Sequence, residues 1–166
     1  MMFAGVDPGL DGAIAFFRPR DRWLSVFAMP TVDVIRNKKQ KREIDCKAVS
    51  AIFRQHAPFC DLAAVEGVSG IAGQSAGSSF VFGQATGIVL GALGHYAMPV
   101  LRPAPAVWKR AMGVTADKRS SLAKASLLFP QHSGLWTRLK DDGIAEAALL
   151  AYWASTWGVK IHKEVE

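Results

Sequence analysis

The chain has 166 residues, half of them hydrophobic, and its 20 lysines and arginines outnumber its 14 acidic residues to give a formal net charge of +6. This size and composition predict a single domain over residues 1–166 with a full core, and the basic balance favours a polyanionic partner, although only weakly. Two cysteines without CxxC spacing exclude a disulfide framework, and the lack of a signal peptide or of an apolar run of ~20 residues predicts a soluble cytoplasmic protein without a membrane partner.

Three apolar or alternating runs open the chain and predict an antiparallel meander of three strands. They span Met2–Val6, Gly12–Phe17 and Trp23–Met29. Asp7 closes the first run directly before Pro8-Gly9, a turn signal that places its carboxylate at the carboxyl end of the strand. An acid before Pro-Gly is also ordinary turn chemistry, and that alternative stays open.

Residues 37–42, Asn-Lys-Lys-Gln-Lys-Arg, predict a basic loop. The candidates for phosphate contact in it are Lys38, Lys39, Lys41 and Arg42. The alternative is a solvated run of charge with no partner. Asp45 then suits the N-cap of a helix over Cys46–His56.

A second acid closes a second apolar run, Leu62–Val65, where Glu66 stands before Gly67. Glutamate is poor in strands and is rarely buried without a partner, so a purely structural role explains Glu66 less well than Asp7. The glycine-rich stretch that follows, up to Ser78, is typical of a binding or gating loop. Ile71 within it is a candidate wedge against bases, and a disordered connector is the alternative.

A long helix is predicted from about Ser79 to Tyr96, followed by a short strand over 99–101 and helices near 105–112 and 118–129. In the long helix Gly83, Gly87 and Gly91 recur every fourth residue and leave one face without side chains. Glycine has a low helix propensity, so its recurrence in a helix indicates a close approach by another backbone. This face is predicted to pack either against the chain's own sheet or against a partner subunit.

The last predicted helix, from about Asp141 to Trp157, carries Asp142 and Glu146 four residues apart and therefore on one face. Clustered carboxylates are costly unless they are paired or bind a metal such as Mg²⁺. The alternative is that Asp142 is an N-cap and that Glu146 only favours the helix dipole.

Acids from three separate segments, without a Cys/His cluster, favour a two-metal phosphoryl-transfer site over a zinc site. A basic periphery around an acidic centre suits a protein that attracts a phosphate backbone. The order of elements predicts an α/β fold, in which helices flank a mixed central sheet of three antiparallel strands followed by two parallel ones.

A set of short segments matches a known family in order and spacing. They are Val6-Asp7-Pro8-Gly9 with Gly12-Ala13-Ile14-Ala15, Ala64-Val65-Glu66, Phe82-Gly83-Gln84-Ala85-Thr86-Gly87, Pro105 to Lys109 with Trp108, Lys118, Phe129-Pro130, and Asp142-Gly143-Ile144-Ala145-Glu146-Ala147. With them the chain resembles, over nearly its whole length, the RuvC-like Holliday junction resolvases of the RNase H-like superfamily, especially the compact bacteriophage versions.

The resemblance implies a homodimer that binds a four-way DNA junction and nicks two strands symmetrically, in DNA recombination, repair or phage DNA processing, in a bacterial or phage-infected cell. It implies two Mg²⁺ or Mn²⁺ ions per active site, and a dimer interface at the helix around Phe80–Tyr96. The implied catalytic acids and metal ligands are Asp7, Glu66, Asp142 and Glu146. Lys109 and Lys118 fall where the family has basic residues near the scissile phosphate, so Lys118 would stabilise developing charge.

Two positions depart from the family pattern. Gly143 stands where the bacterial enzymes have the first of two aspartates three residues apart, and helical geometry favours Asp142 over Asp141 as its replacement. Ser69, a further candidate DNA contact, stands near where those enzymes carry an aromatic residue. Two other functions remain possible: another RNase H-like nuclease acting on flaps or RNA–DNA hybrids, and a junction-binding protein without catalysis.

Overall fold

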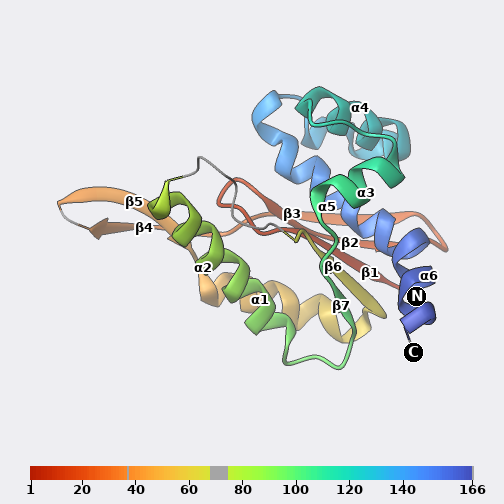
Figure 1. Ribbon diagram of the computed structural model, residues 1–166, viewed down its shortest axis with the longest axis horizontal. Coiled ribbons are helices and arrows are strands. Elements are labelled where there is room, and N and C mark those ends of the chain that lie inside the picture. The colour runs from red at the N-terminus through yellow and green to blue at the C-terminus, as the bar shows by residue number, and fades with distance from the viewer. Residues whose placement is uncertain (37, 68–74, 166) are drawn as a thin grey trace.

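A mixed five-stranded sheet forms the centre of the protein. The structure is a computed structural model, which describes residues 1–36, 38–67 and 75–165. The strands lie in the order β3-β2-β1-β6-β7 (Figure 1). Their bounds are β1 Phe3–Asp7, β2 Ala13–Arg18, β3 Trp23–Ala28, β6 Leu62–Val65 and β7 Val100–Leu101. The first three strands are antiparallel and β6 and β7 run parallel to β1, which confirms the predicted α/β class and the meander.

Helices cover both faces of this sheet (Figure 1). The helices are α1 Cys46–His56, α2 Ala76–Leu93, α3 Pro105–Met112, α4 Lys118–Leu128, α5 Asp142–Trp153 and α6 Val159–Val165. Alternate strand residues face opposite layers, so that Phe3 and Phe17 pack with α3, α4 and α5. Their neighbours Ala4 and Phe16 pack with α1 and α2 in a second core.

The predicted helices are present, with some shifted ends. The Asp45 side chain caps α1 by accepting hydrogen bonds from the backbone N–H groups of Lys47 and Ala48. Ser75 caps α2 in the same way and starts it three residues earlier than the sequence pattern indicates. Beyond α5 the chain makes one π-helical turn, Ala154–Gly158, before α6, so the last helix is not continuous. Short 3₁₀ turns lie at Ala57–Phe59, Pro130–Leu135 and Leu139–Asp141.

The prediction of a basic loop over residues 37–42 is wrong for most of that segment. Lys39–Ile44 is strand β5, which pairs antiparallel with β4, Thr31–Arg36. This two-stranded ribbon belongs to no larger sheet and projects away from the molecule (Figure 1). It covers almost no core, and β5 lacks the apolar alternation that marks a half-buried strand. The cross-strand pairing of Asp33 with Arg42 instead matches opposite charges.

Helix α2 is the only helix in the described ranges that is long and apolar enough to cross a membrane, judged by length and composition alone, and a single such helix is weak evidence of a span. One side of α2 is buried in the core, through Ala85, Thr86, Val89 and Leu93. The three glycines are exposed, and a Cβ built on any of them would meet nothing within 4 Å. The glycine face therefore does not pack against the chain's own sheet, which removes one of the two alternatives left by the sequence.

Candidate active site

Asp7 and Glu66 lie side by side at the carboxyl ends of two parallel strands. The register of β1 and β6 pairs Val6 with Val65, and the Glu66 N–H donates to the carbonyl of Val6 at 2.9 Å. Because side chains alternate along a strand, both acids project to the face covered by α3, α4 and α5.

Helix α5 brings the other two acids to the same place. Its backbone lies directly on β1, since a Cβ on Gly5 would come within 2.3 Å of the Ala147 carbonyl oxygen. Asp142 is the first residue of α5, and Glu146 is one turn further along. The charges of Glu66, Glu146 and Asp142 all act on the Asp7 carboxyl group and raise its pKa. Four acids from three segments thus form one electrostatic group.

The close packing around Gly143 explains why this chain has no aspartate at that position. A Cβ there would lie 2.4 Å from the carbonyl oxygen of Asp11 and 2.8 Å from Oδ2 of Asp7. No side chain fits between α5 and the loop after β1 in this arrangement, so an acid cannot occupy position 143. Asp142 supplies the carboxylate from one residue earlier.

Asp141 lies outside this group. Its carboxylate bonds to the Arg138 guanidinium at 2.7 Å and accepts the Arg138 backbone N–H at 2.9 Å. These bonds hold the pKa of Asp141 below its usual value. Of the two candidates at the start of the last helix, the structure brings only Asp142 to Asp7.

Burial and neighbouring charges raise the pKa values of two of the acids, Asp7 and Glu66. Burial raises the pKa of Asp7 to about 7, with further contributions from Glu66, Glu146 and Asp142, while a hydrogen bond from the Gly9 N–H opposes the rise. Burial also raises the pKa of Glu66. Protonation, or a cation bound beside them, therefore stabilises both carboxyl groups.

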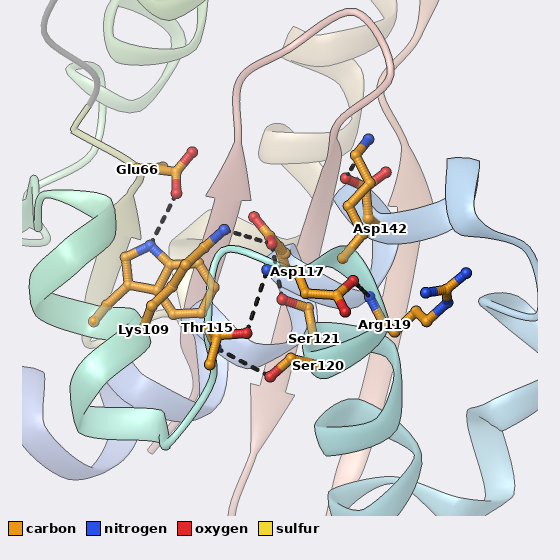
Figure 2. A network of polar contacts seen from close by, with 11 residues as sticks. Glu66, Lys109, Thr115, Asp117, Arg119, Ser120, Ser121 and Asp142 are labelled. Atoms are coloured by element: carbon orange, nitrogen blue, oxygen red, sulfur yellow. Dashed lines mark hydrogen bonds and ion pairs between the residues drawn. The ribbon is translucent and has the colours of Figure 1, made fainter.

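Four donors contact three of the acids, and Figure 2 labels two of the donors, Lys109 and Ser121, together with Glu66 and Asp142. The Trp108 indole Nε1 donates to Oε1 of Glu66 at 2.9 Å, and the Ser121 hydroxyl donates to Oε1 of Glu146 at 2.8 Å. The Lys109 ammonium lies 2.7 Å from the same Glu146 oxygen. The Lys118 ammonium lies 2.8 Å from Oδ2 of Asp142, which raises the pKa of Lys118.

The family resemblance singles out the two lysines but not the contacts of Trp108 and Ser121. Trp108 stands out only as part of a segment that matches the family, and nothing in the sequence around Ser121 distinguishes it from other helix serines. Both contacts join residues distant in the chain, so no local spacing predicts them.

Among the contacts of the described residues, each acid keeps one carboxylate oxygen for a further ligand. The hydrogen bonds and ion pairs of the site engage Oδ1 of Asp7, Oε1 of Glu66, Oδ2 of Asp142 and Oε1 of Glu146. Within the described ranges no three such side chains already converge tightly enough to hold a metal ion. The donor set itself, four clustered carboxylates, fits a hard divalent cation, which prefers oxygen ligands.

The predicted DNA contacts fall in two places. Lys109 and Lys118 lie at the acids, as described above. Lys38 occupies the turn of the β4–β5 ribbon with a φ of 61°. Lys39, Lys41 and Arg42 are exposed on β5, and Arg42 forms an ion pair with Asp11 at 2.6 Å, next to the acid group. Ser69 and Ile71 lie outside the described residues.

Comparison with solved structures identifies the fold. Thermus thermophilus RuvC in complex with a Holliday junction substrate matches with a TM-score of 0.59 and 14% sequence identity, covering 96% of each chain. Another structure of Thermus thermophilus RuvC matches with a TM-score of 0.52 and 17% identity, covering 95% of this chain and 97% of that one. No protein-family model and no curated protein sequence matches. The chain has the RuvC-like fold.

Proposed function

We propose that this chain is a divalent-metal-dependent endonuclease that nicks four-way DNA junctions symmetrically as a homodimer. The observation that carries the proposal is the convergence of Asp7, Glu66, Asp142 and Glu146 on one face of a RuvC-like fold. Fold alone does not assign a function. An acidic group at the carboxyl ends of the strands, contacted by two lysines, suits phosphodiester hydrolysis.

The four acids would hold two Mg²⁺ or Mn²⁺ ions through their unengaged oxygens. Ions bound there would stabilise charge on the phosphate and lower the pKa of a bound water. Asp7 would be one of the ligands, because the charges of Glu66, Glu146 and Asp142 all act on its carboxyl group. The negative charges around Asp7 would favour a bound cation, since a cation compensates their mutual repulsion.

Lys118 and Lys109 are suited to hold the scissile phosphate once they leave the carboxylates. The Lys118 side chain is 58% exposed, so its ammonium can turn from Asp142 to a phosphate oxygen and stabilise developing negative charge. The Lys109 side chain is 20% exposed and reaches the group from α3. In the free protein the same two lysines offset the repulsion between the acids.

The β4–β5 ribbon extends the proposed DNA-binding surface beyond the acids. Residues 31–44 carry five basic side chains against two acidic ones. Lys38, Lys39, Lys41 and Arg42 are exposed, and Arg42 connects the ribbon to the loop that follows β1 through Asp11. Phosphate contacts of this kind would position the duplex without reading its sequence.

The exposed glycine face of α2 is the proposed dimer interface. Gly83, Gly87 and Gly91 lie on one side of the helix and contact no other described part of the chain. A second α2 can approach such a face closely, backbone to backbone. Two active sites related by a twofold axis would account for symmetric nicking.

Cleavage of an end-labelled four-way junction tests the proposal. Wild-type protein with Mg²⁺ or Mn²⁺ should give paired nicks, and Glu66→Gln should give none while binding the junction normally in EDTA. Asp21→Asn is the matched control, because Asp21 forms an ion pair with Arg18 in the exposed turn between β2 and β3. Tight junction binding by the wild type with no nicks in either metal would refute the proposal. Preferential cutting of a flap or an RNA–DNA hybrid in the same panel would show a different nuclease specificity.

A further inference from the structure

Two of the four donors at the acids are neutral and completely buried. Trp108 and Ser121 both have 0% exposure. The indole of Trp108 donates to Oε1 of Glu66 from α3, and the hydroxyl of Ser121 donates to Oε1 of Glu146 from α4. Each bond occupies one oxygen of its carboxylate and leaves the other without a partner in the described part of the chain.

Neutral donors and lysines act differently when a cation enters. An ammonium group repels a metal ion at the same carboxylate, so Lys109 and Lys118 compete with it. An indole N–H or a hydroxyl carries no net charge and can keep its bond to one oxygen while the other oxygen binds the ion. The side chains of Trp108 and Ser121 are also fixed by the surrounding core, whereas the Lys118 side chain is more than half exposed.

We propose that Trp108 and Ser121 are positioning residues that orient the carboxylates of Glu66 and Glu146 for a divalent cation. This inference rests on the proposed function, because it assumes that the acid group binds metal. Hydrogen bonds to metal ligands fix their orientation, and their removal typically lowers metal affinity about 10–100-fold. The assignment joins α3 and α4 to the site, although neither helix carries one of the four acids.

The chain contains a matched control for each residue. Trp136 is also buried, at 2% exposure, and donates its indole Nε1 to a side chain at 3.0 Å, but its acceptor is Ser126. Ser126 lies on α4 like Ser121, and its hydroxyl donates to the Leu122 carbonyl at 2.9 Å. Trp136→Phe and Ser126→Ala therefore remove the same groups from the same core without touching an acid.

Calorimetric titration of the DNA-free protein with Mn²⁺ tests the inference. Trp108→Phe and Ser121→Ala should weaken Mn²⁺ binding about tenfold or more. Trp136→Phe and Ser126→Ala should bind as the wild type does, and Ser121→Thr should retain wild-type affinity because it keeps the hydroxyl. Junction binding in EDTA should be unchanged in all five variants, and thermal unfolding selects the folded ones. If Trp108→Phe fails to fold, Ser121→Ala decides the result.

The outcomes separate this inference from the proposed function. Wild-type Mn²⁺ affinity in both Trp108→Phe and Ser121→Ala would overturn the positioning role even if the wild type nicks junctions. An equal loss of affinity in Ser126→Ala would also overturn it, by showing a general effect of core damage. If the wild type binds Mn²⁺ and the two variants lose it, but no junction is nicked, the positioning role stands and the proposed function fails.

Discussion

The protonation of Asp7 links the acid group to the stability of the metal-free protein. Its pKa is raised from 3.8 to about 7 in the folded protein. An acid whose pKa is raised on folding binds more protons in the folded state than in the unfolded state between these two values. Stability from this group is therefore complete below pH 3.8 and falls as pH rises toward 7.

The size of this effect follows from the shift. At 1.36 kcal/mol per pKa unit, the full change amounts to about 4 kcal/mol, of which about 3 kcal/mol is lost between pH 5 and pH 8. Asp7→Asn removes the titrating group and keeps the side-chain shape. We therefore expect Asp7→Asn to be more stable than the wild type at pH 8 in EDTA, by an amount that shrinks by about 3 kcal/mol at pH 5.

Urea denaturation of both proteins at pH 5 and pH 8 in EDTA measures this difference. His56, whose pKa is lowered by burial, titrates in both proteins, so its contribution cancels in the comparison. The remaining pH dependence belongs to Asp7 and to the acids whose charges act on it. Adding Mn²⁺ at pH 8 should stabilise the wild type much more than the variant. An Asp7→Asn protein that is less stable than the wild type at pH 8, or a difference that does not change with pH, would refute the reasoning.

Three further variants test separate parts of the structure. Gly143→Asp should destabilise the protein by several kcal/mol in urea denaturation, because its Cβ would lie 2.4 Å from the Asp11 carbonyl oxygen; near-wild-type stability would show that the close approach of α5 is wrong. Gly87→Arg should convert a dimer to a monomer in light scattering, since it places a charged side chain on the exposed glycine face; an unchanged mass would move the interface elsewhere. Lys39→Glu with Lys41→Glu should weaken junction binding and lower the slope of log affinity against log salt by about 2, while an unchanged slope would remove the ribbon from the binding surface.

Strands β1 and β6 of the central sheet are predictable from the sequence because they are buried. Phe3–Asp7 and Leu62–Val65 are short apolar runs that end in turn signals. A strand that is buried on both faces has such a continuous apolar sequence, which makes it recognisable. The sequence pattern therefore suffices to place the acids at the ends of these two strands.

The same reasoning fails where an element covers no core. The β4–β5 ribbon is held by its own backbone hydrogen bonds and by charge pairs, and its polar strand β5 has no apolar period to detect. Hydrophobic patterning reports burial, so an exposed strand and an exposed loop look alike to it.

Contacts between residues distant in the chain are the other feature that the sequence does not predict. Helical periodicity favours Asp142 over Asp141, but only the structure shows Asp141 bound to Arg138 and Gly143 pressed against Asp7. The donation of Trp108 to Glu66 and of Ser121 to Glu146 likewise depends on how α3 and α4 dock, which no single segment encodes.

The close packing of α5 on β1 has a consequence for the order of events during synthesis. Asp7 belongs to the first strand and Glu146 to a helix made near the end of the chain, and Gly5 allows their backbones to meet. A nascent chain whose α5 is still inside the ribosome has only Asp7 and Glu66 of the four acids in place. It also lacks the helix that packs on β1. The proposed hydrolytic activity would therefore begin only after α5 has folded onto β1.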